Sequence, residues 1–233
     1  MIRQFHQRLK TWQNQLGQKY GSDISTPAAR RAAGWHFHLS DHAFLRVWWT
    51  NVAEIAPGVW RSNQPSPQRL ARHARDGFKT IINLRGAPNE SFWLFEDEAC
   101  RAHGLTLYNL KLSARGAPNR ARLLELHHLF TTVARPMLIH CKSGADRTGL
   151  AAALYLIWVE NRPLAEAQAQ LSLRYMHVAQ SSTGILDHFL RVYGREAERR
   201  GISILDWITT EYDPAEVSRS YKRWRAGGKE GAW

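Results

Sequence analysis

The chain has 233 residues, of which 44% are hydrophobic and 22% are charged, and its formal net charge is +12 at pH 7. This length favours one domain with a sizeable core over two domains. The positive charge favours anionic partners (phosphorylated substrates, nucleic acid or an acidic membrane surface) without ranking them. The two cysteines exclude a disulfide scaffold, and no Cys/His spacing typical of a metal site is present, so we expect neither a metal nor a cofactor.

Apolar residues recur every three or four positions at the start of the chain, which predicts an amphipathic, basic helix: Ile2, Phe5, Leu9, Trp12 and Leu16. Docking on the protein's own core or on a partner is the favoured interpretation, and peripheral contact with an anionic membrane is the alternative. No apolar run approaches the roughly 20 residues that span a bilayer, and no secretory signal is present. We therefore expect a cytoplasmic protein, with the inner face of a membrane as the alternative location.

Residues 22–57 alternate between polar and aromatic types and contain several breakers, so we expect an irregular extension wrapped on the domain, with a short helix near 41–49. The N-terminal region of residues 1–56 thus combines a helix and this extension. At the other end, residues 213–233 are basic and aromatic. A solvated or loosely docked tail is favoured there, and binding of nucleic acid or lipid is the alternative.

Strand and helix patterns alternate through residues 57–212. The expected strands cover 59–62, 80–85, 105–110 and 136–141. The expected helices cover 66–76, 91–103, 119–134, 148–161, 163–175, 184–199 and 202–208. Such alternation is typical of βαβ units, so the sequence predicts an α/β fold with a parallel-rich central sheet flanked by helices.

The last of these strands leads into a loop that carries candidate chemistry, His140-Cys-Lys-Ser-Gly-Ala-Asp-Arg-Thr-Gly149. The carboxyl edge of a parallel sheet is where open α/β folds bind ligands, and the loop amides and the next helix N-terminus would converge on an anion. A thiol at the base of such a loop should be a thiolate, because its pKa falls below the usual value of about 8.5. Arg147 can hold two phosphate oxygens, and Thr148 can donate its hydroxyl to the thiolate. A nucleophile, an oxyanion cradle and a clamp thus lie within a few residues of each other.

His-Cys, five residues and Arg-Thr-Gly resemble the signature of the protein tyrosine phosphatase superfamily. Residues 57–193 resemble its dual-specificity branch, particularly the compact bacterial members. The resemblance implies a cysteine phosphatase fold and metal-independent hydrolysis of phosphate monoesters through a phosphocysteine intermediate. It assigns Cys141 as nucleophile and Arg147 as phosphate-binding arginine. The remaining loop residues would bind phosphate: Lys142, Ser143, Gly144, Ala145 and Thr148. A buried structural cysteine and a rhodanese-like sulfur carrier fit these residues less well.

The sequence departs from that resemblance at the general acid. Members of the superfamily usually carry an aspartate roughly 30 residues before the cysteine, but residues 110–120 contain neither Asp nor Glu. Asp146 is the favoured substitute, with helix capping as its structural alternative. The acidic group at 96–98 is a second source, although a solvated helix face is the favoured interpretation. The third explanation is that the leaving group is good enough to depart without an acid, as in RNA 5′-triphosphatases.

Arg115 is a candidate substrate contact on a loop expected to overhang the pocket, and Lys111 and Ser113 share that loop. The expected substrate is a phosphorylated protein or a phospholipid. A catalytically weak phosphate-binding module and an RNA 5′-triphosphatase-like enzyme are the alternatives. For Cys100, a buried helix cysteine is favoured over a protective disulfide with Cys141.

Overall fold

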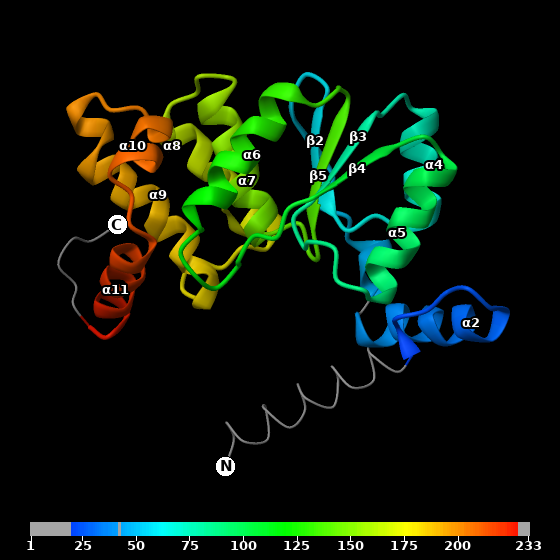
Figure 1. Ribbon diagram of the computed structural model, residues 1–233. Coiled ribbons are helices and arrows are strands. Elements are labelled where there is room, and N and C mark those ends of the chain that lie inside the picture. Colours follow the sequence, from blue (N-terminus) through cyan, green and yellow to red (C-terminus); the bar gives the residue numbers. More distant parts are fainter. Residues whose placement is uncertain (1–19, 42, 228–233) are drawn as a thin grey trace, which may run out of the picture.

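A five-stranded sheet with the strand order β1-β2-β5-β3-β4 forms the centre of the molecule (Figure 1). The strands are β1 (Ala53–Ala56), β2 (Val59–Asn63), β3 (Thr80–Asn83), β4 (Thr106–Asn109) and β5 (Met137–Cys141). All neighbours are parallel except β1 and β2, which form an antiparallel hairpin. The predicted parallel-rich α/β sheet is therefore confirmed. The computed structural model describes residues 20–41 and 43–227, so the amphipathic helix expected at the start of the chain lies outside the described residues.

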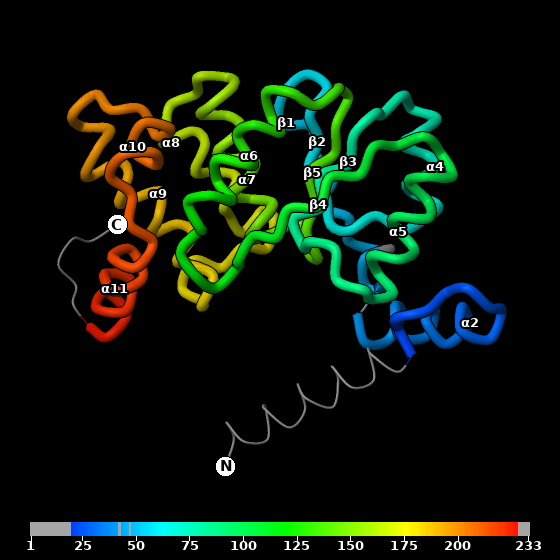
Figure 2. Tube along the Cα trace, in the orientation of Figure 1, coloured from blue at the N-terminus to red at the C-terminus, as the bar shows by residue number. Residues whose placement is uncertain are grey.

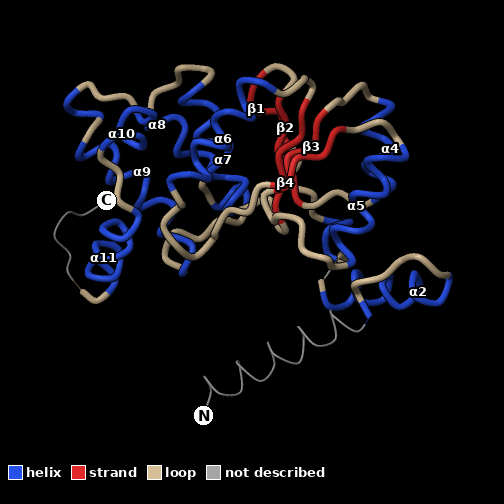
Figure 3. Tube along the Cα trace, viewed as in Figure 1, coloured by secondary structure: helices blue, strands red, loops and turns tan. Residues whose placement is uncertain are grey.

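Helices cover both faces of this sheet (Figure 3). One face carries α4 (Pro67–Arg75) and α5 (Ser91–Ala102), and the other carries α6 (Arg120–Thr132) and α7 (Asp146–Trp158). Side chains alternate along each strand, so Ile81 packs with the first pair of helices while its neighbour Ile82 joins the core around α7. The four helices lie close to the ranges that the sequence predicts.

The chain continues after α7 with α8 (Leu164–Ala167), α9 (Ile185–Glu196), α10 (Ile204–Thr210) and α11 (Pro214–Arg225). The single helix expected over 163–175 is wrong, because α8 is short and is followed by the 3-10 turns Gln168–Gln170 and Leu173–Tyr175. Leu171 has φ −102° and ψ 76°, which ends the 3-10 turn Gln168–Gln170 and leaves neighbouring carbonyl groups available to other partners.

The N-terminal extension contains more regular structure than the sequence analysis expects. It forms α2 (Pro27–Trp35), a π-helical turn (His36–Ser40) and α3 (Leu45–Trp48), which lies where the short helix is predicted. Strand β1 also comes from this region and pairs with β2 across the turn at Pro57 and Gly58. The breaker that suggests a boundary therefore forms a hairpin turn inside the sheet.

Within the basic segment, where the sequence favours a solvated or loosely docked tail, residues Pro214–Arg225 form helix α11. Val217 and Tyr221 are buried, and the Tyr221 hydroxyl donates to the carbonyl oxygen of Ser181 at 2.8 Å. These contacts attach α11 to the rest of the chain beside α9 (Figure 2). Over the described residues, no helix is long and apolar enough to cross a membrane.

Candidate active site

Cys141 ends β5, which lies between β2 and β3 at the middle of the sheet. The side chain is almost completely buried, and burial alone would raise the pKa of its thiol. The positive charge of Arg147, the neighbouring Thr148 side chain and the amides of Thr148 and Gly144 outweigh burial and lower this pKa. The site thus favours a thiolate facing the loop amides and the start of α7.

The loop needs a glycine at position 144, where φ is +75°. A Cβ atom there would lie 2.6 Å from the backbone nitrogen of Asn63 and 2.7 Å from the carbonyl oxygen of Ser62. The loop therefore lies directly on the end of β2. Ala145 and Thr148 are buried, and the Ser143 hydroxyl accepts a hydrogen bond from the amide of Ala145 at 3.3 Å.

A buried arginine, Arg61 on β2, supports the loop from behind. It donates to the carbonyl oxygens of Gly144 at 2.6 Å and of Gln170 at 2.9 Å, and its guanidinium lies 3.5 Å from the centre of the Tyr175 ring. Burial lowers its pKa to about 10, and the charge of Cys141 acts in the opposite direction. Arg61 thus joins the loop to the turns after α8 and adds positive charge behind the thiolate.

Asp146 is the first residue of α7 and lies 2.7 Å from Nδ1 of His177. The other ring nitrogen of His177 lies 2.7 Å from the carboxylate of Asp187. Burial opposes the charged form of both groups, but the hydrogen bond and charge of His177 lower the pKa of Asp146, and those of Asp146 and Asp187 raise the pKa of His177 to about 9. Asp146 is therefore a carboxylate beside an imidazolium at neutral pH.

The N-terminal extension contributes a second buried carboxylate, Asp41. It lies 2.7 Å from Arg46, 2.6 Å from Arg85 and 3.3 Å from Nζ of Lys142 in the loop. Burial would raise the pKa of Asp41, but these three cations hold it well below its usual range. Lys142 is therefore tied to the extension and does not extend freely over the loop.

Asn51 makes a further link between the extension and the loop. Its amide donates to the carbonyl oxygens of Ser143 at 2.9 Å and of Tyr175 at 3.0 Å. The segment just before β1 and the turn around Tyr175 thus meet at the loop.

A cavity of about 560 Å³ opens beside Arg147. Four cationic side chains line it, together with Glu90 and Asn109: Arg85, Lys111, Arg122 and Arg147. Such a cavity can accept a substrate group carrying negative charge next to the phosphate. Lys111 therefore lies where the sequence analysis expects the loop to reach.

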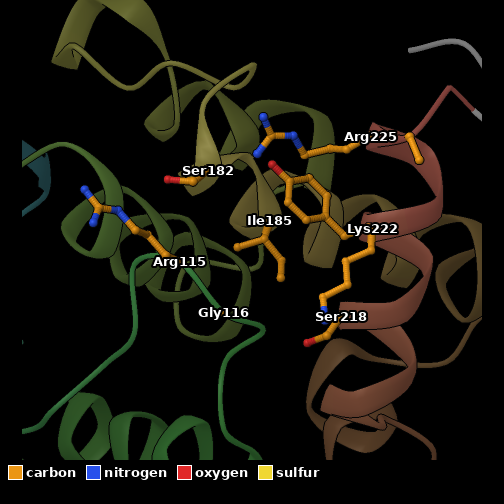
Figure 4. Close-up of a pocket in the computed structure, with 9 residues that line it drawn as sticks. Arg115, Gly116, Ser182, Ile185, Ser218, Lys222 and Arg225 are labelled. Atoms are coloured by element: carbon orange, nitrogen blue, oxygen red, sulfur yellow. The ribbon is translucent and has the colours of Figure 1, made fainter. Parts of the chain in front are cut away.

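Arg115, four residues further along that loop, lines a different cavity of about 640 Å³ between the loop and α11. Ser182 and Ile185 lie across from it, and Lys222 and Arg225 come from α11 (Figure 4). The loop after Cys141 contributes no residue to this cavity, so the structure does not bring Arg115 beside Arg147.

The three acidic residues of α5 do not share one solvated face. Glu96 is buried, with Oε1 lying 2.8 Å from Nε2 of His140, whereas Asp97 and Glu98 pair with Arg101 and Arg30 at the surface. Glu96 thus lies behind the strand that ends at Cys141. The sequence interpretation of a solvated face is wrong for this residue, because its side chain is buried and its carboxyl group lies against His140 and Gln64.

Cys100 is a buried free cysteine of α5, and burial raises its pKa, so the favoured interpretation of this residue is confirmed. Within residues 20–41 and 43–227, no group of three or more His, Cys, Asp or Glu side chains could hold a metal ion. No sequence motif marks Arg61, Asp41 or His177 as parts of the site. Only Arg61 carries a local signal, a charged residue inside an apolar strand pattern.

This fold and loop define a cysteine phosphatase-like protein of the dual-specificity class. The chain belongs to the family described as PTP-NADK, DSP-PTPase phosphatase fused to NAD+ kinase, whose model matches residues 48–186. The resemblance drawn from the loop is thereby confirmed, and the protein is a phosphatase of this type. A search of curated proteins finds no match.

Solved structures share the fold. TpbA from P. aeruginosa is 21% identical with a TM-score of 0.50, over 61% of this chain and 84% of that chain. A DUF442 protein from Shewanella putrefaciens CN-32 is 16% identical with a TM-score of 0.51, over 64% of this chain and 95% of that chain. At these identities the likeness concerns the fold.

We expect Arg61→Met to weaken both the fold and the site. The substitution leaves the carbonyl groups of Gly144 and Gln170 without their donor, which should lower the free energy of unfolding by about 3 kcal/mol. Phosphatase activity should fall at least tenfold, because the loop loses its support. Denaturant unfolding and initial rates measure the two effects. Arg101→Met, at a surface arginine, is the matched control, and equal effects of the two variants would contradict a role for Arg61.

The His177 bridge predicts a pH-dependent stability. The folded-state pKa of about 9 lies above the unfolded value of about 6.5, so the bridge contributes fully below about pH 6.5 and is lost as the pH rises through 9. The difference in unfolding free energy between the parent and His177→Gln should shrink by about 1 to 2 kcal/mol from pH 7 to pH 10. His128→Gln, at an exposed histidine, should show no such trend. A difference that is constant with pH would argue against a charged His177.

Proposed function

We propose that the protein hydrolyses phosphate monoesters through a phosphocysteine intermediate and without a metal ion. The lowered pKa of the buried Cys141 thiol carries this proposal, because only a thiolate is an effective nucleophile at phosphorus. The charge of Arg147 and the amides of Gly144 and Thr148 all act on Cys141, and they suit the negative charge of the equatorial phosphate oxygens. The substrate is a phosphorylated protein or a phospholipid headgroup, and two free cysteines suit the cytoplasm.

The reaction has two displacement steps. The Cys141 thiolate forms a bond to phosphorus while the ester P–O bond breaks, and the leaving oxygen takes up a proton. A water molecule then attacks the phosphocysteine, its proton goes to a base, and the S–P bond breaks to release phosphate and restore the thiolate. Lys142, Ser143, Gly144, Ala145 and Thr148 hold the phosphate in both steps.

Asp146 is the favoured proton carrier, and its environment supports one step more than the other. An acid must hold a proton when the ester binds, and the hydrogen bond with His177 opposes this. A base must be ionised, and Asp146 meets that condition. We therefore assign Asp146 mainly to the activation of water, and the leaving oxygen of the ester takes its proton from solvent at the mouth of the site.

The nucleophile is tested by Cys141→Ser with 4-nitrophenyl phosphate in the presence of EDTA. We expect the variant to lose phosphate release by at least about a thousandfold, because a serine hydroxyl is not ionised at neutral pH. Cys100→Ser is the matched control, since that thiol is buried with a raised pKa and should be dispensable. Retained activity in Cys141→Ser would contradict the mechanism. Binding of phosphate compounds without any turnover by the parent would contradict it as well.

The role of Asp146 is tested by rapid kinetics of Asp146→Asn. If the carboxylate activates water, the variant should release one equivalent of nitrophenol in a burst and then turn over about a hundredfold more slowly than the parent. Acid quenching should trap the phosphoenzyme. A variant without a burst that slows alkyl esters far more than nitrophenyl esters would instead show that Asp146 is the general acid.

A further inference from the structure

The exposed apolar side chains of this protein are not scattered. Among the described residues, every exposed large hydrophobic side chain comes from residues 20–52 or from residues 173–178. Trp48 is 92% exposed, Leu173 is 75% exposed and Met176 is 58% exposed. Single exposed apolar residues are ordinary, but their confinement to two segments needs an explanation.

These two segments meet at the phosphate-binding loop. Asn51, three residues after Trp48, donates to the carbonyl oxygens of both Ser143 and Tyr175. Tyr175, whose ring covers Arg61, lies directly between Arg174 and Met176 in the chain. In Figure 1 both segments lie toward the edge of the sheet where β2 and β5 end. We call the following six exposed side chains the apolar rim: Phe44, Leu45, Trp48, Leu173, Met176 and Val178.

The fold directs the rim side chains outward. In α3 and the residue before it, Arg46 is buried while Phe44, Leu45 and Trp48 are exposed, so one helical face is apolar and free. Met176 has φ +59°, a left-handed conformation that is uncommon outside glycine, and its side chain is exposed although Tyr175 beside it is buried.

The surroundings of the rim are cationic. Residues 43–52 and 172–180 contain no Asp or Glu, and Arg174 in the second segment is exposed. Beside the loop, the cavity at Arg147 adds Lys111, together with Arg85 and Arg122, which pair with Asp41 and Glu125. An apolar edge with a highly exposed Trp and with cations beside it is typical of proteins that dock on anionic lipid headgroups.

We propose that the apolar rim docks the protein on an anionic bilayer, and that the substrate is a phospholipid whose headgroup ends in a phosphate monoester. The rim enters the boundary between headgroups and acyl chains. The terminal phosphate then reaches Cys141 and Arg147, and the cavity cations hold neighbouring negative charge. This inference rests on the proposed phosphatase function and specifies its substrate class.

The test compares one phosphate group in two settings. Phosphatidic acid is supplied in vesicles of phosphatidylcholine and phosphatidylglycerol, and 4-nitrophenyl phosphate is supplied in solution. Trp48→Ser combined with Leu173→Ser removes the two most exposed rim side chains. Trp48→Phe combined with Leu173→Ile is the matched control, because it keeps the rim apolar. Circular dichroism and the rate with 4-nitrophenyl phosphate show that each variant is folded.

We expect the serine variant to lose at least tenfold in phosphate release from the vesicles and in cosedimentation with them, while its rate with 4-nitrophenyl phosphate stays within twofold of the parent. The control should match the parent in all three measurements. Equal activity of the parent and the serine variant on vesicles would overturn the inference. So would a parent that cleaves a phosphotyrosyl peptide faster than phosphatidic acid, with the serine variant slowed on the peptide.

The two proposals fail in different ways. A parent that binds vesicles through the rim but releases no phosphate from 4-nitrophenyl phosphate would contradict the phosphatase mechanism and leave the docking surface supported. A parent that cleaves 4-nitrophenyl phosphate but neither binds vesicles nor cleaves phosphatidic acid in them would contradict the membrane inference alone.

Discussion

The lowered pKa of the buried Cys141 thiol is the feature on which the rest of the site depends. Removing a thiolate from water is costly, so its surroundings must supply positive charge and hydrogen-bond donors in fixed positions. Arg147, Thr148 and the loop amides supply them from the front, and Arg61 does so from behind. Each buried cation then needs oxygen or aromatic partners of its own, and those partners come from distant parts of the chain.

The contacts that Arg61 and His177 make account for the irregular segment between α8 and α9. Arg61 donates to the carbonyl oxygen of Gln170 and lies over the ring of Tyr175. In a continuous helix over 163–175, that carbonyl oxygen would instead accept a hydrogen bond within the helix. His177 must reach both Asp146 at the start of α7 and Asp187 in α9. The chain there forms short turns, because these contacts outweigh the apolar spacing that predicts a helix.

The difference between local and distant contacts explains which parts of the fold and of the site could be predicted from the sequence. The strands and most helices follow from local periodicity, and Cys141 with Arg147 follows from a pattern ten residues long. The residues that contact the loop could not be predicted in this way, because Asp41, Arg61 and His177 are separated from it by tens of residues and belong to no recognisable motif. Likewise Pro57 and Gly58 signal a turn, but only the pairing of β1 with β2 shows that the turn lies within the sheet. Apolar residues such as Trp48 look like core in the sequence, and only the fold exposes them.

The N-terminal extension both holds the ion pairs beside the loop and carries exposed apolar side chains, and the positions of the two are linked. The family match begins at residue 48, yet Asp41 lies before it and pairs with Arg46, with Arg85 and with Lys142 of the loop. Because Arg46 must point inward to meet Asp41, the opposite face of the same helix must point outward, and that face carries Phe44, Leu45 and Trp48. The charges that order the phosphate site thus also determine which apolar side chains surround it. A substitution that releases Asp41 should therefore disturb both the cationic cavity and the surface that approaches the substrate.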